Sequence, residues 1–181
     1  MYGNSLHKIK KEFDEISRNP VAEFGLTVGL VNNDIRKWRF CLCAPKDSIY
    51  NNGFYSLTAT FPQNYPHEPP IICFSNPIYH CNVNPKSPTS PNDPPLGFIN
   101  IYDLGFWNEE KTMLEVITQI YSLFYYVDIN CPYGNEILNE YINNRNVYDE
   151  KVKKFTQKYA NIYSTLNSPL NYTTYWSFND I

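Results

Sequence analysis

The chain has 181 residues, a mass of 21.2 kDa and a formal net charge of −3. This length is enough for one compact domain that buries about 70% of its unfolded surface. With 43% hydrophobic and 18% charged residues, the composition excludes a disordered chain, and the negative charge disfavours nucleic acid as a partner. The longest apolar stretch, residues 120–127, is far shorter than a membrane span. We therefore expect a soluble intracellular protein, cytoplasmic or nuclear, with no membrane partner.

Five cysteines, an odd number at widely spread positions, indicate reduced thiols rather than a disulfide framework. Cys41 and Cys43 lie on one face of an expected strand, but no second pair follows at the spacing of a zinc site. The sequence also contains no glycine-rich phosphate loop and no recognisable Ser/His/Asp constellation. It therefore predicts neither a metal nor a cofactor.

The first half of the chain changes from a helical to an extended pattern. Four apolar residues recur at helical spacing and predict an amphipathic helix that ends at Asn19-Pro20: Leu6, Ile9, Phe13 and Ile16. Extended segments follow at residues 26–31, 38–43, 55–61 and 71–74. Asn52-Gly53, between the second and third of these, is typical of a hairpin turn. Together they predict a four-stranded antiparallel meander.

The second half predicts a long loop and three helices. Residues 85–95, PKSPTSPNDPP, are too rich in proline and serine for a helix or strand and predict an exposed loop. Helical patterns follow at residues 113–124, 135–141 and 148–159. Residues 161–181 are aromatic without a clear period, and this extension either packs on the domain or stays mobile. We therefore expect one α+β domain, residues 1–160, followed by a C-terminal extension.

Several segments occur in the order of a known family. They are LHKIKKEFDEI, KWRFCLCAPKDSIYNNGFY, YPHEPPIICF, His80-Cys81-Asn82, Gly97 with Ile99, Trp107 and FTQKYA. Over about residues 6–160 the chain resembles the eukaryotic ubiquitin-conjugating enzymes, which carry ubiquitin as a cysteine thioester and pass it to a lysine. The resemblance implies the fold just predicted and a place in the ubiquitin or ubiquitin-like conjugation pathway.

The chain departs from that family at the reactive position. After Gly97-Phe98-Ile99, where the family pattern Gly-x-Ile-Cys-Leu has its catalytic cysteine, stands Asn100. A carboxamide cannot replace a thiolate as the nucleophile.

The residues expected around Asn100 also differ from the family pattern. Cys81 replaces the proline of the family's His-Pro-Asn motif, and Cys131 stands where members often have an acidic residue. Asn82, matching the asparagine that helps to fix the active-site loop and the oxyanion, is expected to make a structural hydrogen bond. The histidine of the motif, His80, is expected to be a structural residue too.

The resemblance also implies two partner-facing surfaces. Lys8 and Lys11 match basic positions that meet the activating enzyme, although a solvated lysine face explains them equally well. His67, Glu109 and Glu110 occupy the loops that face the ligase. Because apolar anchors normally carry such interfaces, these residues make ligase binding doubtful.

Two functions follow. In the first, the protein is a non-catalytic variant that binds ubiquitin or an active conjugating enzyme, although such variants generally lack the two C-terminal helices kept here. In the second, it is an active conjugating enzyme with a displaced thiol, Cys131 or Cys81, or a form in which Asn100 is an engineered replacement. The first interpretation is favoured, because Asn100 cannot form the thioester.

Overall fold

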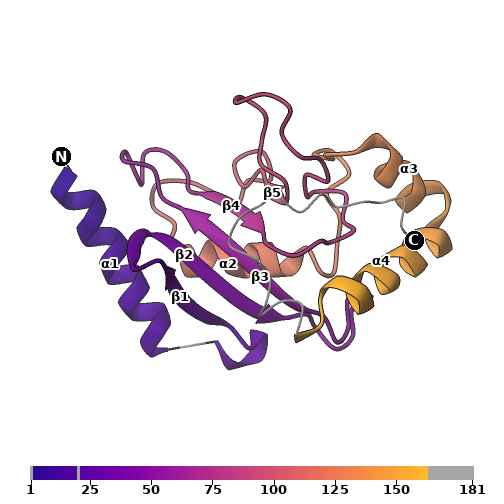
Figure 1. Ribbon diagram of the computed structural model, residues 1–181, viewed down its shortest axis with the longest axis horizontal. Helices are drawn as coiled ribbons and strands as arrows, with labels where there is room; N and C mark the ends of the chain where they lie inside the picture. Colours follow the sequence, from indigo (N-terminus) through magenta and orange to yellow (C-terminus); the bar gives the residue numbers. More distant parts are fainter. Residues whose placement is uncertain (1, 20, 163–181) are drawn as a thin grey trace.

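The computed structural model describes residues 2–19 and 21–162 of the chain (Figure 1). In this part the helices are α1 (Tyr2–Arg18), the one-turn 3-10 helix η1 (Ala22–Phe24), α2 (Met113–Ser122), α3 (Asn135–Asn143) and α4 (Arg145–Tyr159). The strands are β1 (Thr27–Val31), β2 (Asp34–Cys43), β3 (Phe54–Thr60), β4 (Ile71–Phe74) and β5 (Phe98–Ile99). They form one antiparallel sheet in the order β1-β2-β3-β4-β5. The predicted α+β class is confirmed.

The sheet separates a core face from an outer face. Successive side chains of a strand point to opposite sides, and the alternate residues Trp38, Phe40 and Leu42 of β2 are fully buried, as are Tyr55 and Leu57 of β3. Figure 1 shows α2 behind the sheet, α1 beside β1, and α3 and α4 at the far end. The core therefore lies between the sheet and α2.

The tight hairpin lies at a different place from the predicted one. Asn32 and Asn33 join β1 to β2 with φ values of 52° and 57°, as a two-residue turn of type I′ requires. The predicted Asn52-Gly53 instead ends a longer connection, residues 44–53, between β2 and β3. Gly53 is needed there because a Cβ would lie 2.4 Å from the ring of Tyr55.

The short strand β5 was not predicted. It pairs Ile99 with Ile72 and Phe98 with Cys73 of β4, and an isolated bridge joins Val83 to Ile99. Two residues are too few to show an alternating pattern, so this strand is set by its neighbours. Its importance is positional, because Asn100 follows directly.

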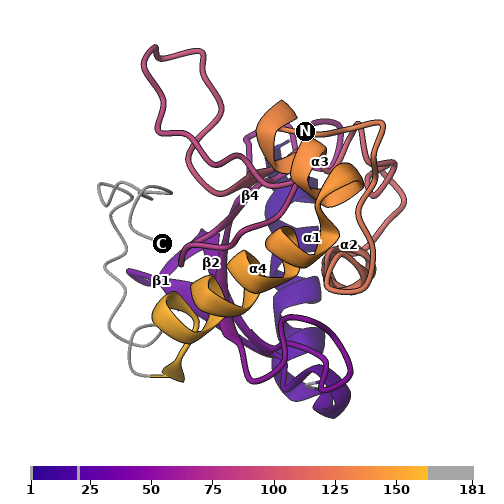
Figure 2. The same cartoon turned by 90° about the vertical axis from the view of Figure 1, so that its right-hand side faces the viewer.

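The proline-rich segment forms the expected exposed loop, and Figures 1 and 2 show it projecting away from the sheet. At its tip, the Asp93 carboxylate accepts hydrogen bonds from the backbone N–H groups of Thr89 and Ser90 and from the Thr89 hydroxyl, each 2.8 Å long. At its base, the Asn84 amide lies 3.0 and 2.8 Å from the carbonyl oxygens of Pro94 and Pro95. Side-chain amides and carboxylates thus shape a loop that has no strand partner.

The first helix departs from its predicted stripe, since Leu6 is exposed and Glu12 is buried. Apart from Asn161 and Ile162, the predicted C-terminal extension lies outside the described residues. No helix in the described ranges is long and apolar enough to cross a bilayer.

Candidate functional site

The turn after β4 carries His80, which is buried and fully hydrogen-bonded. Its Nε2 donates to the carbonyl oxygen of Leu123 at 2.9 Å, and its Nδ1 accepts the backbone N–H of Asn82 at 3.0 Å. Burial lowers the pKa of His80 to about 4, so the ring is neutral at neutral pH. With both ring nitrogens occupied, His80 acts as a structural residue and leaves no nitrogen free to serve as a general base.

Asn82 ties this turn to the loop that follows α2. Its Nδ2 donates to the carbonyl oxygens of Asp128 (2.7 Å) and Cys131 (2.9 Å), and its Oδ1 accepts the backbone N–H of Asp128 (2.9 Å). Because the side chain is completely buried and both amide hydrogens are engaged, Asn82 has no donor left for an oxyanion in this conformation. The structure gives it the structural hydrogen bonds that were expected.

Cys81, between these two residues, is fully buried. Burial raises the pKa of its thiol to about 12, so the thiolate is scarce at neutral pH. These properties argue against Cys81 as a displaced nucleophile.

Asn100 begins a tight turn directly after β5. Its Oδ1 accepts the backbone N–H of Asp103 at 3.1 Å, and its Nδ2 donates to the Asp103 carboxylate at 2.6 Å. The backbone carbonyl of Asn100 accepts the N–H of Leu104 at 3.1 Å. Both ends of the Asn100 amide are therefore used to hold the turn, and neither end is a nucleophile.

Cys131 lies beside this turn. Its Sγ is 3.5 Å from the carbonyl oxygen of Asp103, and the residue is half-buried. Burial, followed by the charges of Asp128 and Asp103, raises the pKa of the Cys131 thiol. The structure thus places Cys131 beside the turn that Asn100 begins, in surroundings that disfavour the thiolate.

Two residues that the sequence analysis did not single out complete this site. Asp103 contacts both Asn100 and Cys131, and Tyr133 packs its ring against Phe98 with centroids 6.0 Å apart. Burial raises the pKa of Tyr133 to about 12, and a hydrogen bond to the Asn100 side chain opposes that rise. The Asn-x-x-Asp spacing, which is typical of a side-chain-capped turn, is the sequence signal that could have revealed Asp103.

A groove with a volume of about 450 Å³ adjoins Tyr133. It runs between the base of the proline-rich loop, the start of α3 and α4, and its walls include Tyr79, Pro85 and Glu136. At the α4 end, the Tyr79 hydroxyl donates to Glu140 at 2.7 Å, and Glu140 also accepts from Lys151 at 2.5 Å. The charged residues of that wall are therefore paired with each other.

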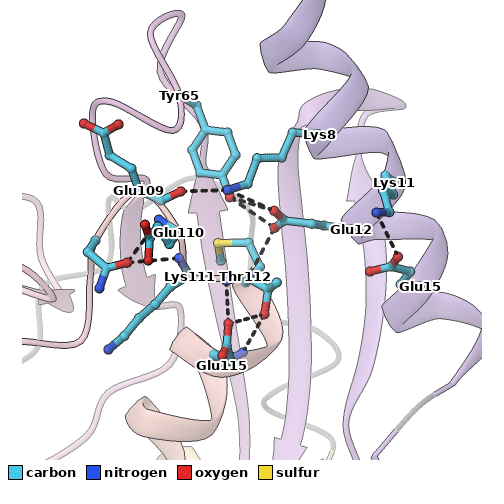
Figure 3. A network of polar contacts seen from close by, with 12 residues as sticks. Lys8, Lys11, Glu12, Glu15, Tyr65, Glu109, Glu110, Lys111, Thr112 and Glu115 are labelled. Atoms are coloured by element: carbon cyan, nitrogen blue, oxygen red, sulfur yellow. Dashed lines mark hydrogen bonds and ion pairs between the residues drawn. The ribbon is translucent and has the colours of Figure 1, made fainter.

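The predicted activating-enzyme residues differ in their surroundings (Figure 3). Lys8 donates from its Nζ to the backbone carbonyl of Glu109 at 2.9 Å and lies 3.8 Å from the Glu12 carboxylate. Lys11 is exposed and pairs only weakly, at 3.9 Å, with Glu15. Lys8 is therefore engaged within the chain, whereas Lys11 remains accessible.

Glu12, which the sequence analysis missed, is the centre of this network. Its carboxylate accepts from the Tyr65 hydroxyl at 3.1 and 3.2 Å and from the backbone N–H of Met113 at 3.0 Å (Figure 3). Met113 is the first residue of α2, so the carboxylate lies at the positive end of that helix. Burial raises the pKa of Glu12 despite these bonds.

Two of the three residues predicted to face a ligase contact one another. His67 Nδ1 lies 2.8 Å from the Glu109 carboxylate, and both side chains are mostly exposed. The backbone N–H of Glu110 donates to Asn108 Oδ1 at 3.0 Å within an exposed turn. The structure thus brings Lys8, His67 and Glu109 together, while Glu110 remains apart at the surface.

Within the described ranges, no group of three or more His, Cys, Asp or Glu side chains could hold a metal ion. All five cysteines are free thiols.

An N-terminal helix, a five-stranded antiparallel meander and three C-terminal helices together define a conjugating-enzyme type of α+β domain. The sequence profile of the family described as "Ubiquitin-conjugating enzyme" matches residues 8–156. Among solved structures, the fold is similar to that of a Plasmodium yoelii protein assigned as a ubiquitin-conjugating enzyme. The TM-score is 0.73 and the identity 22%, over 87% of this chain and 96% of that chain. The chain belongs to the ubiquitin-conjugating enzyme family.

Proposed function

We propose that this protein is a non-catalytic member of the family, which binds ubiquitin, a ubiquitin-like protein or an active conjugating enzyme without itself carrying a thioester. The observation that carries the proposal is the occupant of the reactive position. Asn100 supplies a carboxamide there, and both of its polar atoms are hydrogen-bonded to Asp103. Positioning effects accelerate transfer only when a nucleophile exists.

The thiols nearest to this position support the same proposal. Cys81 is buried, and burial, followed by the charges of Asp128 and Asp103, raises the pKa of the Cys131 thiol. Reactive cysteines normally have a cationic neighbour or a helix N-terminus that lowers the thiol pKa. Neither feature accompanies Cys131 in the described contacts.

The test is an incubation of the protein with activating enzyme, ATP and ubiquitin, followed by a non-reducing gel. We expect no conjugate that disappears on reduction. A reducible conjugate formed by the unaltered chain would contradict the proposal. The Asn100→Cys variant is the positive control for binding to the activating enzyme, and we expect it to charge incompletely because the altered loop remains.

A displaced thiol is the second candidate function, and the position of Cys131 favours it. This half-buried thiol adjoins the turn that Asn100 begins. The same incubation with Cys131→Ser decides the matter, because an active displaced nucleophile would give a conjugate that this variant lacks.

We propose weak or absent binding to RING and HECT ligases. The ligase-facing loops present a charged, paired surface, in which His67 and Glu109 contact one another, instead of an apolar anchor. Calorimetric titration with several ligase domains tests this. Tight binding that Glu110→Ala abolishes would contradict it.

The proposal also requires that the protein binds ubiquitin, a ubiquitin-like protein or an active conjugating enzyme. Titration against ubiquitin, ubiquitin-like proteins and a panel of active conjugating enzymes should identify at least one partner. Failure to bind any of them would remove the support for a binding module.

A further inference from the structure

The proline-rich loop, residues 85–95, contains a short internal repeat. Proline recurs at every third position, and the triplets read Pro-Lys-Ser, Pro-Thr-Ser and Pro-Asn-Asp before the next proline. Ser87 and Ser90 therefore share the pattern Pro-x-Ser-Pro. Proline fixes φ and has no backbone N–H, so a serine in this pattern favours an extended backbone. Proline-directed protein kinases phosphorylate a serine that precedes proline, and the sequence offers them two.

The structure distinguishes the two serines by their surroundings. Ser90 lies in the middle of five consecutive exposed residues, 88–92, whereas Ser87 is half-buried. The segment just before Ser87 is also held at the base of the loop, because the Asn84 amide accepts the N–H of Lys86 at 3.1 Å and donates to its carbonyl at 3.0 Å. Figure 2 shows the loop projecting away from the sheet, which leaves its tip accessible to an enzyme.

The Ser90 hydroxyl is available for chemistry. It accepts the backbone N–H of Asn92 at 3.3 Å and donates no hydrogen bond to any residue that the structure describes. One lone pair and the proton of this hydroxyl are therefore free to react. The neighbouring Thr89 differs, because its hydroxyl donates to the Asp93 carboxylate and it precedes a serine instead of a proline. Ser90 is thus the exposed acceptor of the loop.

We propose that Ser90 is a phosphorylation site for a proline-directed protein kinase, and that the phosphate releases the Asp93 carboxylate from the tip of the loop. In this step the Ser90 Oγ attacks the γ-phosphorus of ATP and forms a new P–O bond, while the bond from that phosphorus to the bridging oxygen breaks and ADP leaves. The hydroxyl proton passes to the catalytic carboxylate of the kinase. This inference is independent of the proposed function.

The release follows from the way in which Asp93 holds the tip. Hydrogen bonds from the Thr89 hydroxyl and from the N–H groups of Thr89 and Ser90 lower the pKa of Asp93, so its carboxylate is charged at neutral pH. A phosphoserine carries about 1.5–2 negative charges at neutral pH. On Ser90, this charge repels the carboxylate and competes for the same N–H donors. The tip should therefore open, whereas the base that Asn84 holds stays closed.

The first measurement is the rate at which an active mitogen-activated protein kinase phosphorylates each serine of the full chain with ATP, with phosphopeptides quantified by mass spectrometry. A synthetic peptide of residues 82–98 gives the preference of the kinase in the absence of the fold. The rate at each serine in the chain is divided by the rate at the same serine in the peptide. Ser87→Ala and Ser90→Ala assign the two sites.

We expect the normalised rate at Ser90 to be at least tenfold higher than the normalised rate at Ser87, because the fold shields Ser87 and presents Ser90. Equal normalised rates would overturn the proposal, since the pattern Pro-x-Ser-Pro alone would then decide the site. The absence of phosphate on Ser90 of the full chain would also overturn it, whatever the peptide shows.

The second measurement follows the backbone amide signal of Thr89 by NMR in the isotope-labelled full chain. Asp93→Ala gives the position of this signal without the carboxylate, and Asn92→Ala, which keeps the backbone N–H that Ser90 accepts, is the matched control. We expect phosphorylation to move the Thr89 signal most of the way to its position in Asp93→Ala, and Asn92→Ala to leave it in place. A signal that does not move toward that position would overturn the release of Asp93.

Discussion

The turn at His80–Asn82 and the turn at Asn100–Asp103, whose first residue is the one matched to the family's catalytic cysteine, differ in burial. In the first, all three residues are buried and the polar side chains of His80 and Asn82 are fully bonded. In the second, one amide and one carboxylate hold an exposed turn. More hydrogen bonds therefore hold the buried turn than the exposed one, and we expect the buried turn to contribute more to the stability of the fold.

The largest loss of stability is expected from a substitution in the buried turn. Asn82→Ala removes three hydrogen bonds and leaves backbone groups of Asp128 and Cys131 without their partner. We expect the free energy of unfolding to fall by about 3 kcal/mol or more. Urea denaturation measures it, with Asn92→Ala in the exposed loop as the control. A loss as small as the control's would show that the loop does not depend on Asn82.

The pH dependence of stability sharpens the same comparison. The pKa of His80 is about 4 in the folded protein and about 6.5 when unfolded, so between these values the unfolded chain binds more protons. The neutral His80 ring therefore contributes fully to the free energy of unfolding above pH 6.5. As the pH falls from 6.5 toward 4, this contribution is lost, and the free energy of unfolding decreases by about 3 kcal/mol.

Denaturation at pH 6.5 and pH 4.5 checks this expectation. His80→Gln should flatten the profile between these values whatever its absolute stability, whereas the exposed His67→Gln should not. Parallel profiles for the native chain and His80→Gln would contradict the assignment.

The exposed turn should show its effect in reactivity rather than stability. Because the carboxylates of Asp128 and Asp103 help to raise the pKa of the Cys131 thiol, this thiol should be alkylated more slowly than a free cysteine at neutral pH. Asp128→Asn should accelerate the reaction by about threefold, since one negative charge is removed. Asp149→Asn on α4 is the control. A rate above that of free cysteine would revive the displaced-thiol function.

The smallest effect is expected at the surface predicted to face a ligase. Glu109→Ala removes the exposed contact with His67 but keeps the backbone carbonyl that Lys8 bonds. Such pairs contribute about 0.2–1 kcal/mol, so the midpoint of urea denaturation should barely move. A larger loss would mean that this pair, and not Glu12, holds the loops to α1.

Periodicity and turn chemistry predicted most of the fold, because buried apolar stripes repeat over many residues. The family resemblance singled out Asn100, Asn82 and Cys131, and the roles it implies for them stay predictions. Glu12, Asn84 and Asp103 were missed, since a polar side chain is matched to its partner by tertiary contact and not by spacing. The tight hairpin was misplaced because Asn-Gly and Asn-Asn both suit positive φ, and only the pairing of β1 with β2 decides between them.

The geometry at Asn52-Gly53 has a consequence for chemical ageing. Asparagine followed by glycine deamidates when the glycine backbone nitrogen attacks the asparagine side-chain carbonyl and expels ammonia, and water then opens the resulting succinimide ring to aspartate or isoaspartate. Here the N–H of Gly53 donates to the carbonyl of Tyr50 at 2.9 Å, and the carbonyl of Gly53 accepts the N–H of Ala44 at 2.8 Å. The nitrogen therefore cannot reach the attacking position without local opening. We expect isoaspartate at position 52 to accumulate in step with unfolding, so that its appearance in stored protein would serve as a chemical record of how often this end of the sheet opens.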